Sequence, residues 1–397
     1  MKKVLLFLMI TLAWNAHAQS SMELTATEVA VKMIPGWNLG NTMEAGDKAH
    51  NFTNKGGLDA ETAWQDTRTT QEIINYVRSL GFRSIRIPCA WVMGHISDST
   101  NYTIDPAWMA RVKEIVDYSL NAGLYVVINQ HWDGGWLENS IANTDPDVIA
   151  KNKTVLKRVW EQIAETFKGY DERLLFAGLN EPEAKDQVAT DNLLEYEQDF
   201  IKTVRYSGGN NAQRILIIQG PSTNIDHTCQ FMTKLPVDLV SQRLMIEVHY
   251  YEPWQWWGME KDENWGKVFY YWGTENHVNG SEHNANHGEE DYMEEQLEKM
   301  RRQFAEKGIP VYIGEFGANW RTITSANECQ DKHNSSIQYH YKTFLKKCFQ
   351  KGLIPVVWDT NYRGKPSMTM INRKDQNIYN EYMMKGLHEA MEEAVVK

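Results

Sequence analysis

The stretch Leu174-Leu175-Phe176-Ala177-Gly178-Leu179-Asn180-Glu181-Pro182 joins an apolar run to a polar end. The run predicts a short buried strand, and Pro182 ends it because proline has no N–H to donate to a sheet ladder. Glu181 is therefore expected at the carboxyl end of this strand. Because a carboxylate there is poorly suited to core packing, the pattern favours a catalytic acid.

Similar apolar runs recur along the chain and are separated by segments of helical periodicity. The predicted strands are Met33–Leu39, Ser84–Cys89, Tyr125–Asn129, Leu174–Leu179, Ile215–Gln219, Met245–His249, Val311–Gly314 and Ile354–Trp358. The predicted helices include Gln71–Leu80, Pro106–Ala122, Asp147–Phe167, Leu193–Arg205, Tyr292–Lys307, Ser336–Lys351 and Asn377–Val395.

Eight strand–helix repeats, with each strand apolar on both faces, predict a parallel sheet covered by helices. Closed on itself, such a sheet is a single (β/α)8 TIM barrel. The alternative is an open doubly wound sheet, but no glycine-rich phosphate loop follows the first strand. The pattern therefore favours the barrel, with long loops after strands 1 and 6.

The first eighteen residues predict a secretory signal peptide. A basic start precedes an apolar run, and Ala16-His17-Ala18 forms a cleavage site. The apolar run is too short to span a bilayer, and no cysteine follows the cleavage site to carry a lipid. We expect an exported chain, in the periplasm or outside the cell, whose residues 19–397 form one catalytic domain.

Composition narrows the classes of partner. The net charge of −11 argues against a nucleic-acid surface, which needs a basic patch. No later segment is long and apolar enough for a membrane span, and we expect a monomer. Of the four cysteines, Cys89 lies in a predicted strand and is expected to be a buried free thiol, whereas a Cys229–Cys329 bridge stays open.

Polar and aromatic residues gather at the carboxyl ends of the predicted strands, where a barrel builds its active site. They are Asn38, Arg86, His131, Asn180, Glu181, His249, Tyr251, Glu315 and Trp358. Each alone has a structural explanation, but their convergence on one rim favours an active site. Glu315 is the expected partner of Glu181.

Two carboxyl groups on opposite sides of a groove are typical of glycoside hydrolases. The reaction needs a proton on the leaving oxygen and stabilisation of an oxocarbenium-like centre, and the two groups can supply both. A separation of ~5 Å gives retention of configuration, and ~6.5–9.5 Å leaves room for water and gives inversion. Arg86 and Tyr251 are candidate donors that keep one carboxylate ionised. Repulsion between the two would keep the other protonated.

Several of these residues lie in motifs that occur in chain order. The motifs are Gly36-Trp37-Asn38-Leu39-Gly40-Asn41-Thr42, Glu61-Thr62-Ala63-Trp64, Ser84-Ile85-Arg86-Ile87-Pro88, Leu179-Asn180-Glu181-Pro182, His249-Tyr250-Tyr251 and Ile313-Gly314-Glu315-Phe316-Gly317. Together they resemble glycoside hydrolase family five, in its bacterial endo-β-1,4-glucanase branch.

The resemblance implies a retaining mechanism without a cofactor, with Glu181 as acid/base and Glu315 as nucleophile. It also implies that Arg86 and Tyr251 support the nucleophile and that Asn180 bonds the 2-hydroxyl of the attacked sugar. By the same resemblance, His131 and His249 line that subsite and Trp358 forms its floor. One departure is His131-Trp132, where relatives often carry two adjacent histidines.

Two long connections, Gly40–Thr69 and Tyr250–Glu290, are expected to be functional. The second contains five tryptophans, which either wall a long cleft for glucosyl rings or pack the loop onto the barrel. The candidate aromatic subsites are Trp64, Trp132, Trp136, Trp254 and Trp257.

The loop Tyr250–Glu290 also carries His277, His283 and His287. Their spacing matches no zinc pattern, and their acidic setting favours a solvated surface over a metal site.

The sequence thus predicts a secreted retaining endo-β-1,4-glucanase acting on cellulose-type or mixed-linkage β-glucans. A xyloglucanase or a mannanase of the same fold stays open as an alternative. Two rivals come from other classes: a glycan-binding barrel without catalysis, and a barrel enzyme for sugar phosphates. The signal peptide and the missing phosphate-binding glycine loop argue against the latter.

Overall fold

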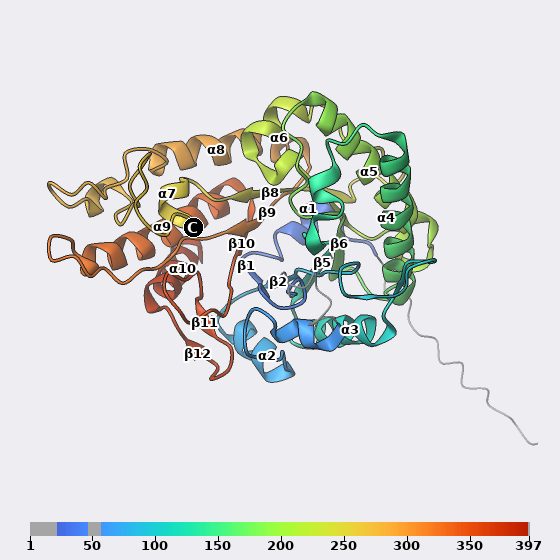
Figure 1. Ribbon diagram of the computed structural model, residues 1–397, viewed down its shortest axis with the longest axis horizontal. Coiled ribbons are helices and arrows are strands. Elements are labelled where there is room, and N and C mark those ends of the chain that lie inside the picture. Colours follow the sequence, from blue (N-terminus) through green and yellow to red (C-terminus); the bar gives the residue numbers. More distant parts are fainter. Residues whose placement is uncertain (1–21, 47–56, 396–397) are drawn as a thin grey trace, which may run out of the picture.

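Parallel strands close into a barrel in the computed structural model, which describes residues 22–46 and 57–395 (Figure 1). Within these residues the eight barrel strands are β1 (Gly36–Asn38), β2 (Ser84–Ile87), β5 (Tyr125–Asn129), β6 (Leu174–Ala177), β7 (Leu216–Gln219), β8 (Leu244–Tyr250), β9 (Val311–Phe316) and β10 (Ile354–Val357). Each pairs in parallel with the next, and β10 pairs with β1. The predicted (β/α)8 fold is confirmed.

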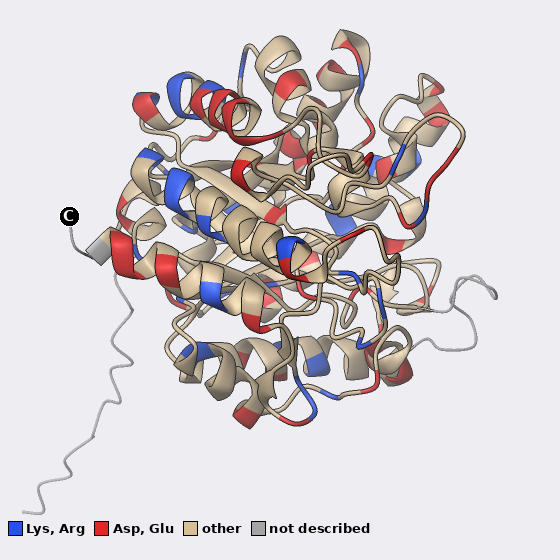
Figure 2. Ribbon diagram, turned by 90° about the vertical axis from the view of Figure 1, so that its left-hand side faces the viewer, with Lys and Arg blue, Asp and Glu red and all other residues tan. Residues whose placement is uncertain are grey.

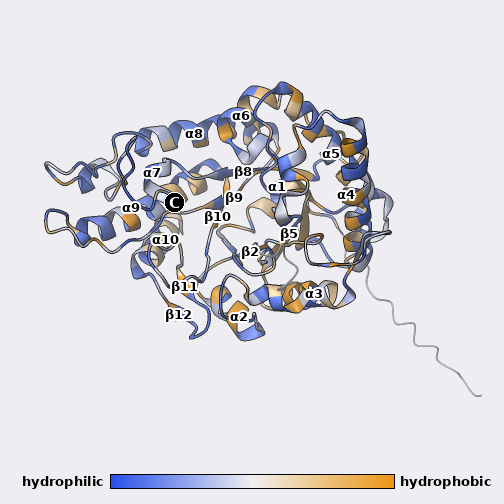
Figure 3. Cartoon of the chain, viewed as in Figure 1, coloured by the Kyte–Doolittle hydropathy of each residue, from blue (hydrophilic) through white to orange (hydrophobic). Residues whose placement is uncertain are grey.

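Helices surround the strands (Figure 1). They are α1 (Ala26–Ala30), α2 (Gln71–Ser79), α3 (Pro106–Asn121), α4 (Pro146–Thr166), α5 (Gln187–Tyr206), α6 (Ile225–Phe231), α7 (Trp254–Trp257), α8 (Glu290–Gln303), α9 (Gln330–Lys351) and α10 (Glu381–Val395). Figure 3 shows apolar and hydrophilic residues alternating along α4 and α5, as expected for helices with one buried face. Small hairpins pair β3 (Ile96–Asp98) with β4 (Thr103–Ile104), and β11 (Ile371–Asn372) with β12 (Asn377–Ile378).

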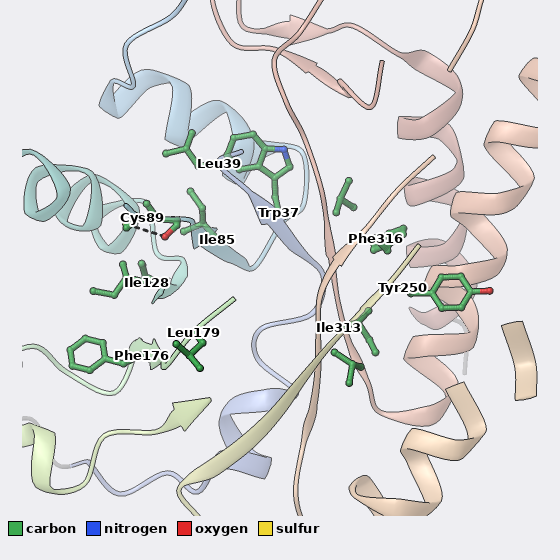
Figure 4. Packing of buried hydrophobic residues seen from close by; sticks show 14 of the residues in the cluster. Trp37, Leu39, Ile85, Cys89, Ile128, Phe176, Leu179, Tyr250, Ile313 and Phe316 are labelled. Carbon is green, nitrogen blue, oxygen red and sulfur yellow. Dashed lines mark hydrogen bonds between the residues drawn. The ribbon is translucent and has the colours of Figure 1, made fainter. Parts of the chain in front are cut away.

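The core has two parts. Between strands and helices, Ile85, Ile128 and Phe176 point away from the barrel toward the surrounding helices (Figure 4). Inside the barrel, a separate cluster includes Leu175 and Met245 and is joined by residues of α1. This cluster fills the barrel interior, so the carboxyl ends of the strands are left for polar side chains.

Some helices begin earlier than predicted. The sequence places starts at Leu193 and Ser336, but α5 begins at Gln187 and α9 at Gln330. Asp186 caps α5, since its Oδ1 accepts from the Ala189 N–H at 2.9 Å. Caps of this kind extend a helix beyond its apolar periodicity.

The last predicted helix begins too early. Residues 377–378 form β12, and α10 begins only at Glu381. Asn380 decides this boundary because its Oδ1 accepts from the N–H groups of Tyr382 and Met383. Helix α6, between β7 and β8, is absent from the sequence-based list.

All four cysteines lie in the described residues and carry free thiols. Cys89 is buried, as predicted. The Cys229–Cys329 bridge is not formed: Cys229 lies on α6 with its Sγ 4.0 Å from the Met300 sulfur, and Cys329 precedes the first residue of α9.

The predicted signal peptide, residues 1–18, lies outside the described residues. In the part of the chain that the structure describes, no helix has both the length and the apolar character of a membrane span. Figure 2 shows acidic and basic residues interspersed along the outer helices. Glu393 of α10, for example, pairs with Lys342 and Lys346 of α9.

The buried histidine His340 generates a prediction about acid stability. It lies in α9 against Trp256 and Trp272, and neither ring nitrogen has a hydrogen-bond partner within the described part of the chain. Burial lowers the pKa of His340 to about 3. The unfolded chain binds this proton near pH 6.5, so stability is full above that pH and falls as acid is added, by about 1.4 kcal/mol per pH unit.

From pH 7.5 to pH 5, we therefore expect wild type to lose about 2 kcal/mol more unfolding free energy than His340→Leu. Urea unfolding at both pH values measures this. His287→Leu, at an exposed position, should lose as much as wild type. Equal losses in wild type and His340→Leu would contradict the assignment.

Candidate active site

Two glutamates meet at the carboxyl ends of β6 and β9. Glu181 follows β6 after a short loop, and Glu315 lies within β9. One carboxylate oxygen of each, together with a ring nitrogen of His249, lies within 4.8 Å of the others. A gap of this size resembles the ~5 Å separation of the two carboxyl groups in retaining glycosidases. It is smaller than the ~6.5–9.5 Å that leaves room for a water in inverting ones.

Glu315 is held by two fixed donors. Arg86 Nη1 donates to its Oε1 at 2.9 Å, and the Tyr251 hydroxyl donates to its Oε2 at 3.0 Å. The side chain is almost fully buried. Burial raises the pKa of Glu315, and the charges of His249 and Arg86 oppose the shift only in part.

Glu181 has a different environment. Its side chain is 46% exposed, and its Oε1 lies 2.7 Å from His249 Nδ1. Its backbone N–H donates to Glu138 Oε1 at 2.6 Å. Burial of the carboxyl would raise the pKa of Glu181, but the hydrogen bond and charge of His249 outweigh it, so the pKa is lowered in the ligand-free protein.

His249 lies between two carboxylates. Its Nε2 is 3.3 Å from Glu247 Oε1, opposite the contact between its Nδ1 and Glu181. Burial disfavours a charged imidazole. The charge of Glu315 and the hydrogen bonds to Glu181 and Glu247 outweigh burial and raise the pKa of His249 to about 10. His249 is therefore an imidazolium that donates from both nitrogens.

Arg86 lies fully buried beneath both glutamates. Besides Glu315, its guanidinium donates to Asn180 Oδ1 at 2.7 Å and to Asn38 Oδ1 at 3.1 Å. Its Nε lies 3.0 Å from Glu247 Oε1, although this N–H is not aimed at the oxygen, so the contact is an ion pair rather than a hydrogen bond. Burial opposes the charge, but Glu247 and Glu315 raise the pKa of Arg86.

A cleft of about 690 Å³ opens above this cluster. Its walls come from the loops after several strands, and the two long connections contribute to them. The lining includes Asn41, Glu44, Trp64, His131, Trp132, Glu138, Asn180, Glu181, His249, Tyr251, Trp257, Glu315, Trp358, Tyr362 and Met368.

Known proteins of one enzyme family are similar to this chain. The family model described as cellulase (glycosyl hydrolase family 5) matches residues 45–364. Endoglucanase A of Paenibacillus barcinonensis is 31% identical, over 95% of this chain and 93% of its own length. The chain belongs to glycosyl hydrolase family 5. It is thus a retaining glycoside hydrolase of the endoglucanase type, and the resemblance seen in the motifs is confirmed.

Solved family 5 structures align with most of this chain. XEG5B, a xyloglucan-specific β-1,4-glucanase from a ruminal metagenomic library solved with XXLG, is 43% identical with a TM-score of 0.84, covering 93% of this chain and 96% of that chain. The Bacteroides ovatus xyloglucanase, solved with an XXXG heptasaccharide, is 30% identical with a TM-score of 0.83, covering 93% of this chain and 77% of that chain.

In this family 5 enzyme, the predicted site residues form two layers. Arg86 and Asn38 lie beneath the cleft, and Asn38 Nδ2 donates to the Gly314 carbonyl at 2.9 Å. His131 and Trp358 line the cleft with parallel rings whose centroids are 6.0 Å apart. Burial and the charges of Arg86 and His249 lower the pKa of His131, so this ring is neutral.

Of the candidate aromatic subsites, some line the cleft and others do not. Trp64, Trp132 and Trp257 line the cleft. Trp136 does not; it packs against the core, and its Nε1 donates to Asp133. Trp254 is exposed and stands edge-on to Trp257, outside the lining of the cleft.

The remaining tryptophans of the loop differ in burial. Trp256 and Trp272 are fully buried, whereas Trp265 is 65% exposed. Trp256 and Trp272 therefore pack the loop onto the barrel, whereas Trp257 is the tryptophan of this loop that lines the cleft.

The three loop histidines do not converge. His277 Nε2 contacts Glu289 Oε1 at 2.9 Å, His283 stacks on Tyr270, and His287 contacts Asn286. Among the described residues, the one set with metal-ligand spacing is Glu181, His249 and Glu315. The positive charges of Arg86 and His249 already lie beside these carboxylates, which disfavours a metal cation there.

Sequence reasoning missed two buried carboxyls of this site. Glu247 lies within β8 under His249, and Glu138 lies in a short 3₁₀ helix, Glu138–Ser140, beside Glu181. A carboxylate inside the apolar run Met245-Ile246-Glu247-Val248 was a readable signal, because a buried strand carries a charge only with a partner. Glu138 gave no such signal, since its loop has no periodicity.

The buried charge of Arg86 leads to a prediction. In Arg86→Leu, Glu247 and Glu315 lose their buried counter-charge, which costs about 3–5 kcal/mol of unfolding free energy. Hydrolysis should fall more than about 100-fold because Glu315 also loses a charge-assisted donor. Urea unfolding and initial rates on a soluble β-glucan measure both effects.

Arg68→Leu is the matched control. Arg68 is half exposed and pairs with Asp59 and Glu61, so its loss should cost about 1 kcal/mol or less. Similar losses of stability in the two variants would contradict the role given to Arg86.

Proposed function

We propose that the protein cleaves internal β-1,4-glucosidic bonds with Glu181 as acid/base and Glu315 as nucleophile. The observation that carries this assignment is the carboxylate pair within 4.8 Å, in which only Glu315 accepts from two donors that stay protonated, Arg86 and Tyr251. Such donors favour the charged form of a carboxyl group, which a nucleophile needs.

The pKa directions in the ligand-free protein run against this assignment, because His249 lowers the pKa of Glu181 while burial raises that of Glu315. The hydrogen bonds nevertheless support the assignment. Arg86 and Tyr251 hold Glu315 in place, whereas Glu181 is half exposed. A bound glucan removes water from Glu181 and raises its pKa, since desolvation disfavours a charged carboxylate.

Two steps follow from these positions. Glu315 attacks the anomeric carbon while Glu181 gives its proton to the departing glycosidic oxygen. Glu181 then takes a proton from water as the water oxygen attacks the same carbon and the ester bond to Glu315 breaks. Two inversions of configuration give net retention.

Other cleft residues support binding of the sugar at this centre. Asn180 lines the cleft, and because Arg86 occupies its amide oxygen, its N–H groups face other acceptors. One acceptor is the 2-hydroxyl of the attacked sugar, whose hydrogen bonds strengthen in the transition state. Trp358, beside His131, offers an indole face as the floor of the subsite.

Xyloglucan is the substrate that the most specific observation favours. XEG5B, a xyloglucan-specific glucanase, shares 43% identity across nearly the whole of this chain. Endo-acting enzymes need an open groove, and xyloglucan also needs space for side-chain sugars. The loops after β1, β8 and β10 contribute to the walls of the cleft, which suits both an open groove and space for side-chain sugars. We also expect export and a monomeric state.

The acid role makes a prediction about leaving groups. Glu181→Gln cannot donate the proton, so turnover of unactivated β-glucans should fall about 10²–10⁴-fold. Aryl glycosides with activated phenol leaving groups need little protonation and should retain most of the rate of their first step. Burst kinetics and initial rates on both classes measure the split, with Glu183→Gln, at an exposed position, as the control. Equal losses would count against Glu181 as the acid.

A hydrolysis panel tests the substrate. We expect cleavage of xyloglucan, with slower cleavage of lichenan and carboxymethylcellulose and none of xylan or mannan. The variant Glu315→Ala should lose hydrolysis yet keep polysaccharide binding. Preference for mannan, or wild-type binding without cleavage, would overturn the proposal.

A further inference from the structure

Glu247 is a fully buried carboxylate inside β8, two residues before His249. Tyr250, on the same strand, points outward and packs on Phe344 of α9 (Figure 4). Glu247 instead faces the interior of the barrel, below the cleft, where it touches His249. It is absent from the lining of the cleft, so it acts on a substrate only through other side chains.

Each oxygen of Glu247 has polar contacts. Its Oε1 lies 3.0 Å from Arg86 Nε and 3.3 Å from His249 Nε2, and its Oε2 accepts from Gln219 Nε2 at 2.6 Å. The other titratable groups that interact with it are Tyr312 of β9, Glu197 of α5 and Glu181 after β6. A charged Glu247 is thus compensated by two cations and one amide.

The backbone is shaped around this carboxylate. A Cβ at Gly314 would stand 1.9 Å from Glu247 Oε1, so no other residue fits there without moving the carboxylate. The pairing of β8 with β9 shifts register at this level, between Val248 and His249. The shift sets His249 opposite Glu315. Glycine before Glu315 therefore makes room for a third acid beneath the pair.

His249 connects this acid to Glu181. Its Nε2 contacts Glu247 and its Nδ1 contacts Glu181, at 3.3 Å and 2.7 Å. A buried acid, an imidazole and a reacting group in line are the arrangement by which serine hydrolases orient their histidine. In the same way, a buried acid can orient a histidine that contacts a proton-donating carboxyl group.

We propose that Glu247 is a positioning residue that fixes His249 and sets the pH range in which Glu181 exchanges its proton. The inference rests on the proposed roles of Glu181 and Glu315. When Glu181 gives its proton to the glycosidic oxygen, its new carboxylate accepts from His249 Nδ1–H, while Glu247 holds Nε2–H. His249 keeps both protons through both steps, and the water proton returns to Glu181.

The isosteric variant Glu247→Gln tests this. It keeps an acceptor oxygen for His249 but removes one negative charge from the cluster. Without that charge, both Glu315 and the Glu181–His249 pair lose protons more readily. We expect both limbs of the kcat/KM–pH profile to move to lower pH by about one unit, with the rate at the new optimum within about tenfold of wild type.

Glu197→Gln is the matched control. Glu197 is a buried carboxyl that accepts from the Gln219 N–H, and burial raises its pKa to about 8. It is therefore already neutral at acid and neutral pH, and its replacement by an amide should leave both limbs in place. Unmoved limbs in Glu247→Gln, or a loss of rate without a shift, would overturn the proposal.

A second measurement needs no folded variant of Glu247. Imidazole ¹⁵N spectra of wild type should contain one doubly protonated histidine above pH 8, and this signal should vanish in His249→Asn. Its absence from wild type would also overturn the inference. If wild type instead hydrolyses no β-glucan while this signal is present, the proposed function fails and the inference about His249 does not.

Discussion

The ion-pair network around Arg86 is the constraint on which the rest of the site depends. This guanidinium is fully buried, yet it contacts Glu247, Glu315, Asn38 and Asn180. These partners come from the ends of β1 and β9, from the middle of β8 and from the loop after β6. A closed parallel barrel brings these ends together on one rim, so one side chain from β2 reaches them all. An open sheet would spread the same residues along an edge.

A count of charges explains how three carboxylates coexist there. Arg86 and His249 carry two positive charges, and Glu181, Glu247 and Glu315 carry three negative ones when all are ionised. One additional proton makes the buried cluster neutral, which low-dielectric surroundings favour. This is the proton that an acid catalyst must hold. The cluster therefore favours one protonated carboxyl. In the proposed mechanism this is the half-exposed Glu181, whose lowered pKa rises when a bound glucan removes its water.

The repeated strands of the barrel could be predicted from the sequence. Apolar runs located all eight barrel strands, and their polar ends named Glu181, Glu315 and Arg86, because register along a strand is local information. Helix starts were less accurate, since caps such as Asp186 extend α5 beyond its apolar face. Glu247 was missed for a different reason. Its partners Arg86 and Gln219 lie far away in sequence, so only the closed barrel shows that its charge is compensated.

The tryptophans of the loop between β8 and α8 have two different structural roles. Trp256 and Trp272 pack around His340, which fastens the loop to α9. Held in this way, Trp257 lies against Tyr251, with ring centroids 4.6 Å apart. The Tyr251 hydroxyl in turn donates to Glu315. The buried tryptophans thus fix the loop. Through it they also hold one wall of the cleft and one of the two donors to Glu315.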